Sequence, residues 1–276
     1  MNLKQIRSIV KRNTGADTMN MPDYSIDQFI NLAQKEVVRQ TLCLKGKVVT
    51  TTQSVAITSI IDYGSTVTGT VAVKSSAHGL STGDTIYITG TTNYNGRYSI
   101  TEIGATDFYI TATYVATNLG GTWGKDEYAL PSDFHKSTLF KIGSYTLEYK
   151  PEEFIDSLYT TNPATGAPYY FYIDLEAGKY GLYPIPMSVI KGSFIYKKKP
   201  ATLAIDADIP DIPELYHDLI VSGASYRVAE QLNKPDIFNH YYALFGALMS
   251  DMANDMAIRQ SDYAPTIIQS ADILDA

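Results

Sequence analysis

Apolar residues recur every three or four positions over the first 45 residues, a spacing that places them on one face of a helix. A first stripe consists of Leu3, Ile6, Ile9 and Val10. A second stripe consists of Ile26, Ile30, Ala33 and Val37. Ser25 and Gln28 have the spacing of a capping box, in which each side chain bonds the other residue's backbone. The second helix is therefore predicted to begin near Ser25.

From about Lys47 the spacing of apolar residues changes to two, which is typical of half-buried strands. Residues 52–123 contain short β runs separated by glycine-containing turns, among them the tight-hairpin pair Asn95-Gly96. This stretch is richer in threonine and poorer in charge than its flanks. It is therefore predicted to be a compact β module inserted into the rest of the chain.

Residues 126–200 form a second β region of different composition, rich in tyrosine and interrupted by prolines. The prolines stay out of the strand centres, as they do in sheets, because proline cannot donate to a ladder hydrogen bond. The candidate strands lie at 139–142, 146–149, 169–173, 180–183 and 193–196.

Helical spacing returns near Asp211, where Asp211 and Glu214 resemble a second capping box. This helix runs to about Leu232, and its small residues 222–224 would let another backbone come close. A last helix, at roughly 236–259, has an apolar stripe made of Phe238, Tyr241, Phe245, Leu248, Met252 and Met256. The residues from Ser261 onward show no sustained period and are expected to form a loose arm unless a partner orders them.

These patterns together predict an α+β fold. In it, the N- and C-terminal helices form a helical bundle, a central antiparallel β domain hangs from the bundle, and a small β-barrel module is inserted in that domain. The predicted segments are the first helices (1–50), the inserted module (51–125), the central β domain (126–210), the last helices (211–260) and an extended arm (261–276).

Composition excludes several classes of function. The net charge of −7 argues against a protein that wraps nucleic acid, because phosphate neutralisation needs clustered lysine and arginine. The 22 tyrosines are typical either of an interface or of a β-rich surface. Cys43 is the only cysteine, so no disulfide can form within the chain. No stretch has the apolar length of a membrane span, and the N-terminus lacks the apolar core of a signal peptide.

The motifs of common active sites are missing from the sequence. It contains no phosphate-binding loop and no nucleophile elbow. Its four histidines, at positions 78, 135, 217 and 240, are scattered singly rather than spaced for zinc. The sequence therefore predicts no enzymatic activity, no cofactor and no metal site.

Two charged clusters allow more than one interpretation. Asp206, Asp208 and Asp211 could ligate calcium, but a solvated turn whose last aspartate caps the next helix explains them better. Residues 197–199 are three lysines that could contact DNA. Lysines beside a proline at a strand end also protect a sheet edge from mispairing, and this second interpretation is favoured.

Residues 1–50 joined to 126–260 resemble the head-to-tail connector adaptors of tailed phages. The cues follow one another along the chain and include a Leu-Pro-x-Asp-Phe opening of the β part and a Tyr-Pro strand end. In this sequence they are the helix from Ser25 to Leu44, Leu130 to Phe134, Gly181 to Pro186, the strand from Gly192 to Tyr196, Pro200 to Leu203, and Asp208 to Ile220.

Residues 77–123 resemble a small β module related to the first catalytic cysteine half-domain of ubiquitin-activating enzymes. The cues are His78 to Leu80, Gly83 to Ile86, Asn95 to Tyr98 and Gly121 to Trp123. This stretch contains no cysteine, so thioester chemistry does not carry over.

The adaptor resemblance implies a structural protein of the virion neck, in a ring of about twelve copies that joins the portal to tail or neck proteins. The genome would pass through the ring without sequence-specific binding, and a total charge of about −84 would repel its phosphates. No membrane is involved. The arm would contact the portal or an adjacent subunit through Tyr263, Ile267, Ile268 and Ile273.

Alternative functions stay open at the level of sequence. A neck stopper or tail-completion protein would occupy a neighbouring place in the virion. A glycan- or receptor-binding module would use the tyrosine-rich middle of the chain. A cell-wall hydrolase would need a carboxylate or metal pair that the sequence does not offer.

Overall fold

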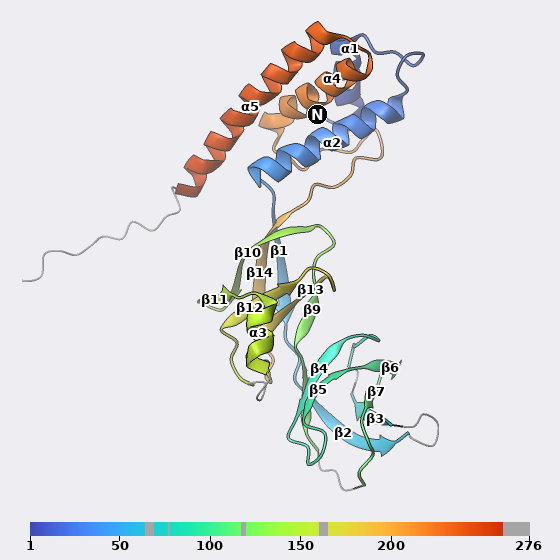
Figure 1. Cartoon of the computed structure of the whole chain (residues 1–276), viewed down its shortest axis with the longest axis vertical. Helices are drawn as coiled ribbons and strands as arrows, with labels where there is room; N and C mark the ends of the chain where they lie inside the picture. Colours follow the sequence, from blue (N-terminus) through green and yellow to red (C-terminus); the bar gives the residue numbers. More distant parts are fainter. Residues whose placement is uncertain (64–68, 77, 117–119, 160–164, 262–276) are drawn as a thin grey trace, which may run out of the picture. The chain divides into compact units, whose positions relative to one another are not determined.

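The computed structural model describes residues 1–63, 69–76, 78–116, 120–159 and 165–261 (Figure 1). The fold is α+β, and the described residues form five α-helices and two curled seven-stranded sheets. The chain divides into two compact units. The helical unit comprises Met1–Lys45 and Lys197–Ala276, and the β unit comprises Gly46–Tyr196.

Helices from both ends of the chain share one hydrophobic core in the helical unit (Figure 1). They are α1 (Leu3–Thr14), α2 (Asp23–Thr41), α4 (His217–Gln231) and α5 (Pro235–Ser261). Leu3, Ile6 and Val10 of α1 are buried, as are Ile26, Ile30, Ala33 and Val37 of α2, which confirms both predicted stripes. From α5, Phe245, Met249 and Met252 complete the core.

The first helix carries the capping box, and the second does not. The Asn2 side chain accepts from the Gln5 amide, and the Gln5 side chain accepts from the Asn2 amide, each at 2.9 Å. The capping box predicted at Ser25 is wrong, because α2 begins two residues earlier, after Pro22, without a side-chain cap. Proline fixes its own φ and so presets the extended N-cap conformation.

The helix predicted from near Asp211 to about Leu232 ends as expected, but its predicted start is wrong. A 3₁₀ turn, η1 (Glu214–Tyr216), leads into α4, and neither helix start has a side-chain cap. The small-residue face of α4 is confirmed. Gly223 is packed so closely that a Cβ there would lie 2.9 Å from the Ala33 Cβ and 2.9 Å from a ring carbon of Phe245.

The first sheet has the order β1-β14-β10-β11-β12-β13-β9. Its strands are β1 (Lys45–Thr51), β9 (Glu127–Ala129), β10 (Phe134–Ile142), β11 (Tyr145–Tyr149), β12 (Tyr170–Asp174), β13 (Lys179–Tyr183) and β14 (Lys191–Lys198). The predicted strands of residues 126–200 are thus confirmed. Its aromatic core is built on Phe140, Phe171 and Phe194, which lie about 6 Å apart by ring centroids.

The predicted purely antiparallel central domain is wrong in one place, because β11 pairs parallel with β12. The chain between them forms helix α3 (Glu152–Tyr159), which the sequence patterns did not predict. Parallel neighbours need a long crossover, and this segment supplies it. Ile155 of α3 is buried with Tyr172 and Tyr183.

The second sheet has the order β5-β4-β8-β2-β3-β7-β6. Its strands are β2 (Val55–Asp62), β3 (Thr70–Ser75), β4 (Thr85–Thr89), β5 (Gly96–Ser99), β6 (Thr101–Gly104), β7 (Asp107–Thr111) and β8 (Thr122–Lys125). Only Ile100 separates the two edge strands, β5 and β6, along the chain, so the sheet must curl to bring its edges together. Its core contains Phe108 and Trp123, and the Trp123 indole donates to the Ser75 hydroxyl at 2.8 Å.

His78 belongs to the internal structure of this second sheet. Its Nδ1 accepts from the Leu80 amide at 3.0 Å, which leaves Nε2 to donate to the Gly104 carbonyl at 2.6 Å. Both ring nitrogens are therefore occupied by backbone groups, which gives this histidine a structural role in the sheet.

Candidate interaction surfaces

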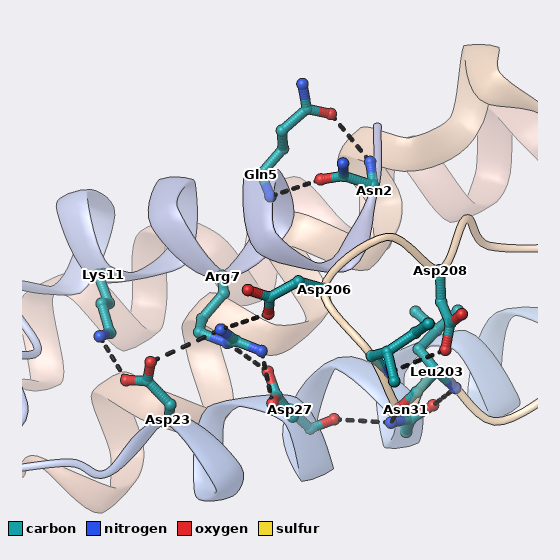
Figure 2. Close-up of polar contacts among 11 residues, drawn as sticks. Asn2, Gln5, Arg7, Lys11, Asp23, Asp27, Asn31, Leu203, Asp206 and Asp208 are labelled. Atoms are coloured by element: carbon teal, nitrogen blue, oxygen red, sulfur yellow. Dashed lines mark hydrogen bonds and ion pairs between the residues drawn. The ribbon is translucent and has the colours of Figure 1, made fainter.

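One arginine joins three acidic residues in the helical unit (Figure 2). Arg7 of α1 makes a bidentate pair with Asp27 of α2, at 2.7 and 2.8 Å, and lies 2.9 Å from Asp206. Asp23 is 3.6 Å from Arg7 and also pairs with Lys11. The hydrogen bond to Asp27 is the main reason why the pKa of Arg7 is raised. Bidentate pairs of this kind fix geometry as well as adding energy, so α1 and α2 are fixed together with the chain around residue 206.

The segment around residue 206 belongs to the acidic loop, which is defined here as residues 201–215. This loop carries four acidic and no basic residues. Asn31 of α2 exchanges two hydrogen bonds with the backbone of Leu203, at 2.9 and 3.0 Å (Figure 2). Gln34 donates to the Ala201 carbonyl at 2.7 Å. Because Gln34 holds residue 201 and Asn31 holds residue 203, the loop runs antiparallel to α2.

The three aspartates of the acidic loop each have a different partner. Asp206 pairs with Arg7, and Asp208 accepts from the amides of Ala204 and Ile205 at 2.7 and 2.9 Å. Asp211 accepts from the Ala201 amide at 2.9 Å, so its predicted capping of the next helix is wrong. The contacts of these carboxylates stabilise the loop. Among the described residues, no three His, Cys, Asp or Glu side chains are placed to hold a metal ion.

The acidic loop exposes several apolar side chains to solvent. Leu203 and Ile212 are buried as anchors. Ile205, Ile209 and Leu215 are 63, 67 and 75% exposed. Since the loop is fixed by backbone hydrogen bonds, these side chains form a preformed apolar surface with acidic neighbours, the kind of surface that marks protein contacts.

A second exposed surface, the α2 outer face, has the opposite charge. It consists of Tyr24, Gln28, Leu32, Lys35 and Arg39, all exposed and all on one side of the helix. Tyr24 is 67% and Leu32 is 49% exposed. The face carries two basic residues and no acidic one, so it is suited to an acidic, apolar partner.

A charge cluster connects the two sheets of the β unit. Arg97 of β5 donates to Asp126 and to Glu127 of β9, each at 2.6 Å. Tyr172 donates to the same Glu127 at 3.2 Å. Lys179 of β13 lies 3.4 Å from Glu127 and donates to the Gly83 carbonyl at 3.0 Å. Residues of the second sheet and of the first sheet thus share one ion-pair network.

Because the cluster is buried, its stability depends on both the Asp126 and the Arg97 charge. Asp126 is fully buried, and this burial raises the pKa of its carboxyl while Arg97 opposes the rise. Burial alone would lower the pKa of Arg97. Asp126 and its neighbours raise this pKa by a larger amount, so the net shift is upward. Either charge would be costly to bury without the other.

The lysines at 197–199 do not protect a sheet edge, so that interpretation is wrong. Lys197 and Lys198 end strand β14, which lies between β1 and β10. Lys197 donates to the Leu42 carbonyl at 2.6 Å, and Lys198 lies 3.4 Å from Asp211. Both lysines therefore have partners within the helical unit.

The family model of the SU10 adaptor protein matches residues 101–269, more than half of the 276-residue chain. The chain belongs to the SU10 adaptor protein family. A search among curated proteins found no match.

Membership in the SU10 adaptor family confirms the predicted phage structural adaptor in its general form. It makes the protein a virion component that associates with other virion components. The matched region begins in the second sheet, at β6, and includes the acidic loop, α4 and α5. The resemblance of residues 77–123 to a ubiquitin-activating half-domain stays a prediction.

Four predicted contact residues of this SU10 family member lie outside the described residues: Tyr263, Ile267, Ile268 and Ile273. The sequence reasoning also missed the Arg7 cluster. The sequence does contain a signal for this cluster. Arg7 and Lys11 are four residues apart, and so are Asp23 and Asp27, so each pair lies on one face of its helix. None of the helices described here combines the length and apolarity needed to cross a bilayer.

Proposed function

We propose that this protein is the head-to-tail adaptor of a tailed phage, a connector ring of the phage neck that joins the portal to the tail. The observation that carries the proposal is the family match over residues 101–269. The ring would contain about twelve copies, and its lumen would form part of the DNA channel. The protein would have no catalytic role.

A closed ring needs two different contact surfaces on each subunit. The helical unit offers two candidates, the acidic loop and the α2 outer face, which expose apolar side chains in surroundings of opposite charge. Because their charges are opposite, the two surfaces would select different partners.

The charge of the protein supports passage of DNA rather than capture. Each chain carries −7. About twelve copies would create a negative potential around the channel, which repels phosphate groups. DNA would then slide through without sequence-specific contacts.

The remaining segments would have separate roles. The arm at 261–276 would dock on the portal or an adjacent subunit through Tyr263, Ile267, Ile268 and Ile273. The bundle segments 1–50 and 211–260 would build the ring. The central domain (126–210) would be a spacer, and the inserted barrel module (51–125) would decorate the neck.

Negative-stain microscopy of the purified protein mixed with its portal protein tests this function. We expect a closed collar on one face of the portal, absent from images of the portal alone. A protein that stays unattached to portal at micromolar concentrations, while binding a glycan or another virion protein, would contradict the proposal.

A further inference from the structure

The described residues of the helical unit leave the α2 outer face exposed, and this face combines two kinds of side chain. Tyr24 and Leu32 supply apolar surface, and Lys35 and Arg39 supply positive charge. No ion pair between described residues involves Lys35 or Arg39. Their near neighbour Glu36 is different, because it pairs with Arg227 of α4 and so belongs to the internal packing.

The chain itself contains a segment of complementary composition. Residues 262–276 include Asp262, Asp272 and Asp275 and no lysine, arginine or histidine. The same segment includes the apolar residues Ile267, Ile268, Ile273 and Leu274. An acidic, apolar peptide of this kind matches a basic, apolar helix face in both charge and hydrophobicity.

A second exposed apolar surface of the helical unit, the acidic loop, does not suit this segment. The acidic loop exposes Ile205, Ile209 and Leu215, but it carries four acidic residues. Like charges brought together across an interface are unfavourable. Charge therefore selects the α2 outer face over the acidic loop.

We propose that residues 262–276 of one copy bind the α2 outer face of a neighbouring copy. This inference rests on the proposed ring, in which each subunit needs a donor surface and a different acceptor surface. Helix α5 ends at Ser261, and the 15 residues that follow could reach about 50 Å when extended. The α2 outer face from Leu32 to Arg39 spans eight residues, about two turns and 12 Å, so a segment of this reach can cover it.

Disulfide trapping between full-length chains tests the inference. In a Cys43→Ser background, one preparation carries Leu32→Cys and a second, isotopically labelled preparation carries Ile268→Cys. Each chain then has a single cysteine, so a disulfide that links a labelled to an unlabelled chain joins positions 32 and 268 of different copies. The matched control replaces Leu32→Cys with Ile205→Cys, which lies on the acidic loop with similar exposure.

We expect mixed disulfides at position 32 at least several-fold more often than at position 205. K35E/R39E should reduce trapping about tenfold, since two charge pairs are turned into repulsions. D272K/D275K in the partner chain should restore it. Circular dichroism of the K35E/R39E chain checks that α2 still folds.

Equal trapping at positions 32 and 205 would overturn the inference, as would trapping that is insensitive to both charge reversals. The mass of the assembly, measured on the same samples, separates the two proposals. Rings that form without trapping at position 32 would refute this contact and leave the ring standing. Chains that never assemble, with or without portal, would refute the proposed function.

Discussion

At the scale of single residues, Arg7 is the point where three distant parts of the sequence meet. Its guanidinium pairs with Asp27, Asp23 and Asp206, so it fixes α1, α2 and the acidic loop together. A charge-assisted bidentate bond is stronger than a neutral one, and its loss would leave Asp27 partly buried without its main partner.

Arg7→Ala should therefore lower the free energy of unfolding by about 2 kcal/mol, as judged from hydrogen bonds to charged groups. Urea unfolding followed by circular dichroism measures the change. The matched control is Arg12→Ala on the same helix, where the side chain is exposed and the expected loss is below about 0.5 kcal/mol. Equal losses in the two variants would show that the network does not stabilise the fold.

Asp208 gives the acidic loop a dependence on pH. The pKa of its carboxyl is lowered by backbone hydrogen bonds, first from Ile205 and then from Ala204. Because the pKa in the folded state lies below the unfolded value of about 3.9, the stabilisation is present above that pH and is lost as the pH falls through the folded pKa.

Asp208→Asn removes the titrating group while keeping an acceptor. The difference in unfolding free energy between wild type and this variant should be largest above about pH 5 and should shrink between about pH 4 and pH 2. Urea titrations at several pH values provide the measurement. A difference that stays constant over this range would mean that the Asp208 charge does not stabilise the loop.

At the scale of elements, the packing of α4 depends on the absence of a side chain at Gly223. A methyl group there would meet Ala33 of α2 and Phe245 of α5, each at 2.9 Å. Overpacking of this kind costs about 1–3 kcal/mol, and the gain in helix propensity offsets up to about 1 kcal/mol of it.

Gly223→Ala should therefore destabilise the protein by about 1–2 kcal/mol in thermal or urea unfolding. Gly246→Ala on α5 is the matched control, because nothing lies within 4 Å of its added Cβ. That variant should be stabilised by up to about 1 kcal/mol through helix propensity alone. Changes of the same sign in both variants would contradict the close packing of α4.

The helices and strands that the sequence predicts well are those with a long, regular apolar period. The stripes of α1 and α2 repeat over several turns, and burial follows them directly. Helix starts were less predictable, because Pro22 and the ion pairs of Asp23 outweigh the Ser25 motif. Helix α3 has only eight residues, too few for a clear stripe.

The candidate surfaces were harder to predict than the elements, because their partners are far apart in the sequence. The parallel pairing of β11 with β12 depends on a crossover that no local pattern specifies. Asn31 and Leu203 are brought together only by the fold. The aspartates of the acidic loop are evident in the sequence, whereas the exposure of Ile205 before them and of Ile209 among them follows only from the fold.

At the scale of the whole molecule, the chain enters and leaves the second sheet at one place. Val55 and Trp123 are register partners in β2 and β8, so their Cα atoms are about 5 Å apart. A Gly-Ser link in place of residues 55–123 should therefore leave the first sheet and the helical unit folded. This deletion also removes Arg97, the partner of the buried Asp126.

Two versions of the deletion give a sharper test than one. Adding Asp126→Asn should raise the stability of the deleted chain, by about 1–3 kcal/mol in urea unfolding, because it removes an uncompensated buried charge. The same substitution in the full chain should destabilise, since Arg97 then loses a carboxylate. Global unfolding of both deleted chains would contradict the view of this sheet as an independent insertion.

The ring itself is tested most directly by the mass of the assembly that the full chain forms with its portal protein. Native mass spectrometry should give a portal complex whose added mass corresponds to about twelve chains of 30.4 kDa, with no partial stoichiometries dominating. A single added chain, a trimer, or no added mass at concentrations where both proteins are folded would contradict the account of this protein as a head-to-tail adaptor ring.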